Sequence, residues 1–163
     1  MNITILGSAA AEAIPNPFCR CRVCEAARDE GGAEVRARAS SIVDDALLLD
    51  LGPDLLASAN RASLYLGELK ALLVTHRHED HWLVQNLYWR RPPFTATPVT
   101  PLDIYGPQDA LDDLTPELAE SADLRCRPVT AGDRWSVDDY QVTAIPASHG
   151  GGTLEPLLYV VEK

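Results

Sequence analysis

The sequence predicts one domain of mixed α and β structure that carries a metal site at the end of a buried strand. Two observations predict this fold class. Short, largely apolar runs such as residues 47–49 and 69–74 have the length and composition of buried strands, whereas residues 81–90 and 108–122 are typical of helices. The chain has 163 residues, of which 46% are hydrophobic, and this is enough for one domain with a core.

Three of the four histidines, His76, His78 and His81, directly follow the apolar run 69–74, and Asp80 lies among them. Residues two apart in an extended chain project to the same side, so His76 and His78 can point at one metal ion. Asp80 and His81 follow where the chain turns and can face a second ion. Imidazole and carboxylate suit zinc, manganese or iron. A histidine-rich surface loop is the alternative, but the H-x-H-x-D-H pattern directly after a strand favours a metal site.

The run His76–His81 resembles the signature of the metallo-β-lactamase-fold hydrolases. This resemblance implies an α+β fold, the αββα sandwich of that superfamily, with two divalent ions, zinc or manganese, in the active site. Two such ions about 3.5–4 Å apart can hold a bridging hydroxide and clamp a phosphate or a carbonyl group.

The resemblance also assigns roles to single residues. His149, which follows the predicted strand 140–145, would complete the first metal site with His76 and His78. A free loop histidine is the alternative. Asp80 would be both a ligand of the second metal, together with His81, and one of two catalytic acidic residues.

Asp50 is the other acidic residue of the predicted catalytic centre. It follows the apolar run 47–49, so it should lie at the edge of the core. In the family pattern this aspartate stands behind the metal-binding histidines, where a carboxylate orients an imidazole and raises its basicity. The alternative is a charge at the N-terminus of a predicted helix over residues 53–60.

Cys19, Cys21 and Cys24 predict a separate, structural zinc site, because the C-x-C-x-x-C spacing lets three thiolates converge on one tetrahedral ion. Free thiols or a redox pair are the alternatives. The same triplet occurs in a branch of the superfamily that includes the cyclic-phosphate phosphodiesterase of the carbon–phosphorus lyase pathway and a pyrroloquinoline-quinone biosynthesis protein. Cys126 is expected to be a small core residue, with a fourth ligand role as the alternative.

The other elements follow from local signals. Asp44 and Asp45 mark a hairpin turn, Gly31 and Gly32 end a short helix, and Pro116 restarts a helix. The expected strands are 2–6, 40–43, 46–50, 71–75, 102–105, 124–129, 140–145 and 157–161, and the expected helices are 23–28, 53–60, 81–90 and 108–122.

The charge balance bears on possible partners. Lys and Arg total 14 against 24 Asp and Glu, a net charge of −10, which argues against general nucleic-acid binding. A small anionic substrate is compatible with this charge, because bound metal ions reverse the local charge of a site. No apolar run approaches the ~20 residues of a membrane span, and the N-terminus lacks the features of a signal peptide, so we expect a cytoplasmic protein without membrane association.

These observations predict a metal-dependent hydrolase, and most specifically a phosphodiesterase that attacks a small, even cyclic, phosphodiester with a metal-bound hydroxide. The cysteine triplet favours the cyclic-phosphodiesterase branch. Two alternatives stay open. One is a protein like the pyrroloquinoline-quinone biosynthesis relative, and the other is a non-catalytic zinc-binding fragment or interaction module.

The family pattern continues beyond what the sequence contains. Relatives carry a later aspartate that bridges the two metals and a further histidine, and neither motif follows His149 here. We therefore expect residues 1–163 to be a single, incomplete domain, the N-terminal part of a longer one that is truncated at the C-terminus. The truncated chain can be inactive by itself even where the whole domain is an enzyme. An unfinished sheet would leave an open strand edge, which favours association into a homo-oligomer.

Overall fold

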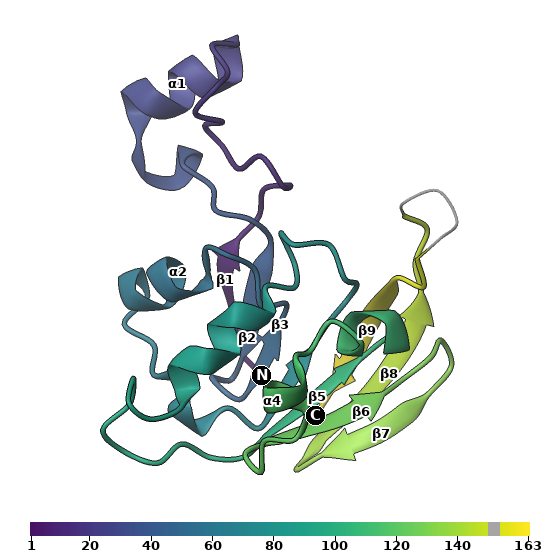
Figure 1. The fold of residues 1–163 in the computed structure, drawn as a ribbon. Helices are drawn as coiled ribbons and strands as arrows, with labels where there is room; N and C mark the ends of the chain where they lie inside the picture. The colour runs from purple at the N-terminus through teal and green to yellow at the C-terminus, as the bar shows by residue number, and fades with distance from the viewer. Residues whose placement is uncertain (150–153) are drawn as a thin grey trace.

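The computed structural model of the chain describes residues 1–149 and 154–163, and they form three stacked layers (Figure 1). A layer of short helices covers one face of a six-stranded sheet, and a three-stranded sheet packs on the other face. The large sheet contains, in spatial order, β1 (Ile3–Gly7), β2 (Ser40–Val43), β3 (Leu47–Leu49), β4 (Ala71–Leu73), β5 (Leu102–Gly106) and β6 (Leu124–Pro128). The small sheet contains β7 (Arg134–Val137), β8 (Tyr140–Pro146) and β9 (Leu157–Glu162).

The strand directions place loops with polar residues at one edge of the large sheet. β1, β2 and β3 pair antiparallel, and β3, β4, β5 and β6 pair parallel. In the parallel register Leu49 lies beside Leu73. Because parallel strands end at the same edge, the residues that follow β3 and β4 meet there.

The central strands are buried on both faces, as strands in the interior of a layered fold must be. Leu48 and Leu72 turn toward the helices, whereas Leu47 and Leu73 turn toward the small sheet. All four side chains are inaccessible to solvent. The continuous apolar runs of the sequence therefore fill two separate cores with alternate residues.

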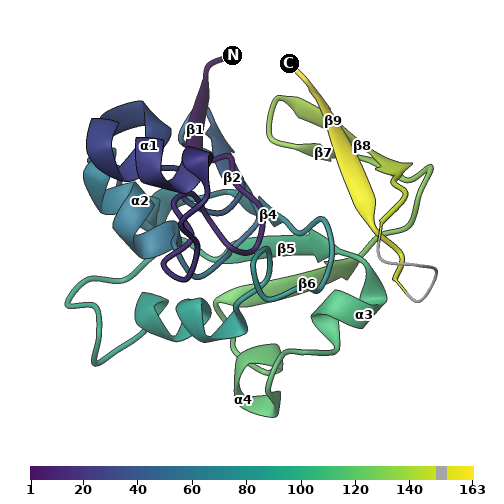
Figure 2. The ribbon, with the colours of Figure 1, turned by 90° about the horizontal axis from the view of Figure 1, so that it is seen from above.

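The helical layer, which in Figure 2 lies to the left of the large sheet at α2 and below it at α4, is made of short elements. They are α2 (Leu55–Arg61), η2 (Leu66–Glu68), η3 (Val84–Arg90), α3 (Gln108–Leu111) and α4 (Pro116–Ala119), of which η2 and η3 are 3-10 helices. Leu55, Leu87, Ala110 and Leu118 pack from this layer onto the large sheet. Because these helices are short, the packing of their apolar side chains on the sheet stabilises them more than their own length does.

The small sheet closes the second core. Val137, Tyr140 and Val142 pack against β3 and β4, and the Tyr105 ring stacks on Trp135 with a centroid distance of 4.8 Å. On its outer face this sheet exposes Leu158 and Val160 of β9. The three layers correspond to three of the four layers of the expected αββα sandwich. Residues 1–149 and 154–163 contain no second helical layer.

Residues 8–39 form an arm that leaves the large sheet after β1 and returns at β2. It carries α1 (Arg22–Glu30) and the 3-10 helix η1 (Gly32–Glu34), and α1 stands clear of the sheets (Figure 1). Arg38 ties the base of the arm to the helical layer, because its Nη1 donates to Asp54 Oδ1 over 2.9 Å. Gly7 permits the tight exit, since a Cβ there would lie 2.0 Å from the Arg38 carbonyl oxygen.

The structure differs from the expected elements at three places. β7 was not expected, because its four residues follow a turn and only Val137 is buried. The expected helix 81–90 begins at Val84, since a parallel bridge between Leu51 and Trp82 holds the preceding residues extended. The expected helix 108–122 is split into α3 and α4, and Thr115 caps the second through its side chain. No helix in residues 1–149 and 154–163 has the length and apolar character to cross a membrane.

The packing of β4 gives a first prediction. Leu72→Ala should lower the free energy of unfolding by about 2–5 kcal/mol, because it opens a cavity in a fully buried position of the helix-side core. Leu56→Ala is the matched control, since Leu56 is exposed, and it should change stability by less than about 1 kcal/mol. Urea denaturation of both variants measures the difference, and equal midpoints would contradict this packing.

Candidate metal centre

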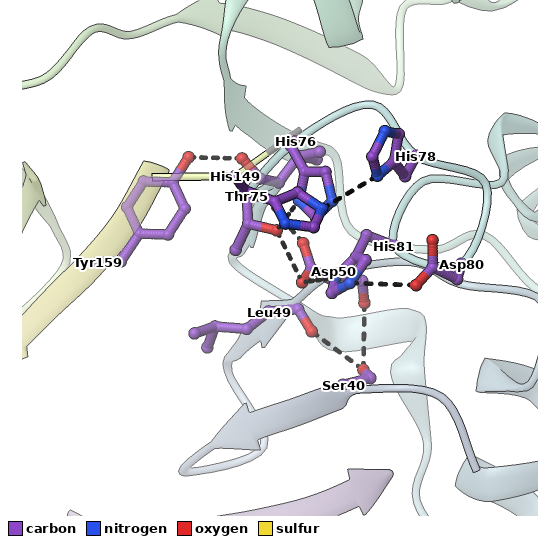
Figure 3. Close-up of polar contacts among 11 residues, drawn as sticks. Ser40, Leu49, Asp50, Thr75, His76, His78, Asp80, His81, His149 and Tyr159 are labelled. Atoms are coloured by element: carbon purple, nitrogen blue, oxygen red, sulfur yellow. Dashed lines mark hydrogen bonds and ion pairs between the residues drawn. The ribbon is translucent and has the colours of Figure 1, made fainter. Parts of the chain in front are cut away.

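The site begins where β3 and β4 end. Thr75 follows β4, Asp50 follows β3, and the Thr75 backbone N–H donates to Asp50 Oδ1 over 2.8 Å. A turn then reverses the chain, because the backbone N–H groups of His81 and Trp82 both donate to the His78 carbonyl oxygen. This turn delivers three histidines to one edge of the sheet (Figure 3).

His76, His78 and His149 converge although they come from different layers. One ring nitrogen from each of the three lies within 4.8 Å of the others. His149 follows β8 of the small sheet, and its Nε2 lies 3.2 Å from His78 Nδ1. The structure therefore brings together the three histidines that the sequence analysis assigns to a first metal.

The surroundings of His76 fit a metal ligand. Its side chain is 6% exposed, and its Nε2 is buried without a hydrogen-bond partner among the described residues. A buried nitrogen without a partner costs free energy, so it marks a position where a further group is expected. Burial lowers the pKa of His76 to about 4, so the ring is a neutral base at pH 7 and has a lone pair to offer.

Asp80 and His81 lie next to this cluster. His81 Nε2 is 3.3 Å from Asp80 Oδ2, and the His81 and His76 rings are 4.3 Å apart between centroids. A carboxylate oxygen and an imidazole nitrogen facing each other suit a second divalent ion. The structure thus places both residues where a second ion would adjoin the first, and their roles as ligands stay predictions.

Asp50 supports both parts of the site from behind. Its side chain is buried, its backbone φ is +62°, and its Oδ2 accepts hydrogen bonds from His81 Nδ1 over 2.7 Å and from Thr75 Oγ1 over 3.0 Å. Ser40 Oγ lies 3.0 Å from the Leu49 carbonyl oxygen and 3.1 Å from the Asp50 carbonyl oxygen, so its one proton is shared between two acceptors on either side of the unusual backbone (Figure 3). The bond to Asp50 raises the pKa of His81, as expected for an imidazole oriented by a carboxylate.

Gly52 permits the close contact between the strand-end loop and the histidine turn. The Leu51 N–H donates to the His81 carbonyl oxygen over 2.7 Å, and the Leu83 N–H donates to the Leu51 carbonyl oxygen over 2.8 Å. A Cβ at position 52 would lie 2.1 Å from the Asp80 carbonyl oxygen, which is closer than any side chain can be. Only glycine lets the two segments approach in this way.

A cavity of about 610 Å³ opens at the histidines. Its polar end is formed by Asp50, Thr75, His76, His81 and His149, and its other walls come from Pro146–Ser148 and Pro156–Leu158. The Leu157 N–H donates to the Thr75 carbonyl oxygen, so β9 fixes this wall to the histidine turn. The size and the mixed lining suit a small molecule.

The cysteine triplet lies far from the histidines along the arm. The sulfurs of Cys19, Cys21 and Cys24 lie within 4.8 Å of one another at the start of α1. The backbone N–H of Cys24 and the thiol of Cys19 lower the pKa of Cys21 to about 7, which favours the thiolate that zinc requires. Cys126 is half-buried in β6 and packs on the helix-side core, which is the core position expected for it.

Sequence reasoning missed three contributors to the histidine site. Thr75 contacts both Asp50 and His76, Ser40 supports the Asp50 backbone, and Tyr159 donates from its hydroxyl to the Val74 carbonyl oxygen over 2.7 Å. Only Thr75 had a usable signal, since a hydroxyl directly before the histidine motif lies within reach of its first ring. Ser40 and Tyr159 contact the site through long-range packing that no local pattern reveals.

The chain belongs to the β-lactamase superfamily domain family, whose sequence model matches residues 46–162. Together with the layers described above, this match confirms the predicted metallo-β-lactamase fold.

Known relatives and solved structures resemble the chain over part of their length. Ribonuclease Z of Pyrococcus abyssi is 27% identical over 123 residues, which are 69% of this chain and 38% of that protein. A diphosphatase from the PhnP family superposes with a TM-score of 0.73 at 22% identity, over 98% of this chain and 60% of the other. Zinc-bound PqqB from Methylobacterium extorquens gives a TM-score of 0.73 at 18% identity, over 99% and 62% of the two chains. The chain thus spans less than two thirds of the length of each of these relatives, from 38% to 62%.

The close approach at Gly52 gives a second prediction. Gly52→Ala should destabilise the protein by about 2 kcal/mol or more and displace Asp80, because the new methyl group meets a backbone oxygen. Gly32→Ala is the control, since no atom of the described residues lies within 4 Å of the Gly32 Cβ position, and the positive φ of Gly32 alone should cost about 1 kcal/mol. Thermal unfolding compares the two, and an equally small effect of both would contradict the close approach.

The cysteine triplet gives a third prediction. Cobalt titration of the reduced protein should produce the near-ultraviolet absorption of a cobalt–thiolate complex, and Cys19→Ser should weaken it strongly, because one of three convergent thiolates is lost. Cys126→Ser should leave the absorption unchanged. An absorption that depends on Cys126, or none at all, would contradict a metal site in the arm.

Proposed function

We propose that this chain is the metal-holding part of a metal-dependent hydrolase, specifically a phosphodiesterase of small molecules. The observation that supports this most is the buried Nε2 of His76, which has no hydrogen-bond partner within residues 1–149 and 154–163 and lies in a cluster with His78 and His149 beside an open cavity. A buried imidazole nitrogen without a partner is best explained by a ligand absent from the polypeptide itself.

The side chains of the site have different proposed roles. His76, His78 and His149 would hold one divalent ion, zinc or manganese, and Asp80 and His81 would contribute to holding a second. When bound, such ions make hydroxide available near neutral pH and stabilise negative charge on the oxygens of a phosphoryl group. Asp50 keeps the His81 ring oriented, and the walls of the cavity confine the substrate beside the ligand atoms.

A small anionic phosphodiester, cyclic esters included, is the proposed substrate class. The names of two relatives, a diphosphatase and a ribonuclease, point to cleavage at phosphorus. The net charge of −10 disfavours a long nucleic acid as the substrate, whereas a small anion needs attraction only at the metal ions.

The three clustered thiols suit a reducing compartment, so we propose a cytoplasmic location. We also propose self-association through the apolar outer face of β9, where Leu158 and Val160 are exposed.

Similarity to zinc-bound PqqB, with the same TM-score as the diphosphatase, supports a second candidate function. Under this candidate function the chain would hold metal at its histidines without hydrolysing phosphodiesters. Turnover of a generic phosphodiester therefore separates the two candidates.

Hydrolysis of bis(p-nitrophenyl) phosphate tests the proposal and gives a fourth prediction. The manganese- or zinc-loaded protein should release p-nitrophenol, and His149→Ala should lower the rate by at least about 100-fold, because loss of a direct ligand exceeds the usual effect of changing a supporting group. Gln85→Ala, at an exposed position, is the control and should retain the wild-type rate. A folded, metal-loaded protein that cleaves no phosphodiester would contradict the phosphodiesterase proposal and favour a non-catalytic metal-binding role.

A further inference from the structure

Thr75 lies between the Asp50 carboxylate and the His76 ring. Its Oγ1 is 3.0 Å from Asp50 Oδ2 and 2.9 Å from His76 Nδ1. Asp50 itself makes no hydrogen bond to His76 among the described contacts, so the hydroxyl is what connects the carboxylate to this ring (Figure 3).

The direction of these hydrogen bonds follows from the number of protons. A hydroxyl has one proton to donate, and an ionised carboxylate can only accept. The Thr75 proton therefore goes to Asp50 Oδ2, and the Thr75 oxygen is left to accept from His76 Nδ1–H. A neutral imidazole with its proton on Nδ1 carries its lone pair on Nε2, the buried atom that has no hydrogen-bond partner in the part of the chain that the structure describes.

The opposite tautomer would be costly. If His76 Nδ1 accepted the Thr75 proton, Nε2–H would be a buried donor with no acceptor among the described residues. An unsatisfied buried donor costs about 1–3 kcal/mol, and Asp50 Oδ2 would lose one of its donors as well. Both effects favour the tautomer that leaves the lone pair on Nε2.

The same carboxylate oxygen also orients the other half of the site. His81 Nδ1 lies 2.7 Å from Asp50 Oδ2, which leaves His81 Nε2 directed toward Asp80. One oxygen atom thus fixes a ring in each half of the site, His81 directly and His76 through the Thr75 hydroxyl.

Backbone hydrogen bonds and the shape of its side chain hold Thr75 in place. Its backbone N–H donates to Asp50 Oδ1, and its carbonyl oxygen accepts from the Leu157 N–H of β9. Its β-branched side chain has few rotamers to choose from, so the hydroxyl loses little entropy on pairing.

We propose that Thr75 is a positioning residue, whose hydroxyl passes the orienting effect of Asp50 to His76 and so sets the tautomer in which His76 Nε2 can bind a metal. This rests on the proposed function only in its last step, the binding of a metal at His76. The tautomer is a property of the metal-free protein.

The first part of the test is nitrogen NMR of the metal-free, ¹⁵N-labelled protein at neutral pH. His76 should show a protonated Nδ1 and an unprotonated Nε2 in the wild type and in Thr75→Ser, which keeps the hydroxyl. Thr75→Val keeps the shape but removes the hydroxyl, and it should give a mixture of tautomers or the reverse one. A wild-type His76 with its proton on Nε2 overturns the proposal, and this result needs no variant to be folded.

The second part, our fifth prediction, is manganese affinity measured by electron paramagnetic resonance of free Mn²⁺, because manganese prefers nitrogen and oxygen ligands to the thiolates of the arm. Thr75→Val should bind Mn²⁺ about 10–100-fold more weakly, and Thr75→Ser within a few-fold of the wild type. Equal affinities and equal tautomers in all three proteins overturn the proposal. A wild type that shows the expected tautomer but binds no Mn²⁺ would contradict the proposed metal function and leave the role of Thr75 in orienting His76 intact.

Discussion

The buried carboxylate of Asp50 is the group on which the rest of the site depends. A buried carboxylate is tolerated only when its oxygens are satisfied, and here they accept from the Thr75 N–H, the Thr75 hydroxyl and His81 Nδ1. The parallel register of β3 and β4 brings these groups together, since Asp50 and Thr75 follow neighbouring strand ends. Asp50 also has a φ of +62°, a backbone conformation that residues other than glycine adopt rarely.

The histidine cluster also depends on the packing of the two sheets. His76 and His78 follow the large sheet, whereas His149 follows β8 of the small one. The apolar core between Leu73 and Val142, together with the hydrogen bond from Tyr159 to the Val74 carbonyl oxygen, sets the distance between these elements. A rigid scaffold of this kind can hold ligand atoms in place before any ion arrives.

Local patterns in the sequence were sufficient to find the ligand-type residues but not the geometry that orients them. The motif at residues 76–81 and the aspartate after an apolar run could be recognised because spacing and strand ends have direct physical consequences. A hydroxyl directly before the motif indicates a contact between Thr75 and His76, but the hydrogen bond from Thr75 to Asp50 could not be derived, since it depends on how β3 and β4 pair. The need for glycine at position 52 and the bridge that delays the helix after His81 both arise from contact between segments far apart in the sequence.

The central claim is that the three histidines form a metal site in this chain. It is tested most directly by the anomalous scattering of zinc in crystals of the protein grown with Zn²⁺. The account predicts a peak about 2.0–2.1 Å from His76 Nε2, His78 Nδ1 and His149 Nε2, together with a separate peak at the three cysteines. A map with zinc only at the cysteines, or with His76 Nε2 paired to another protein atom, would contradict it.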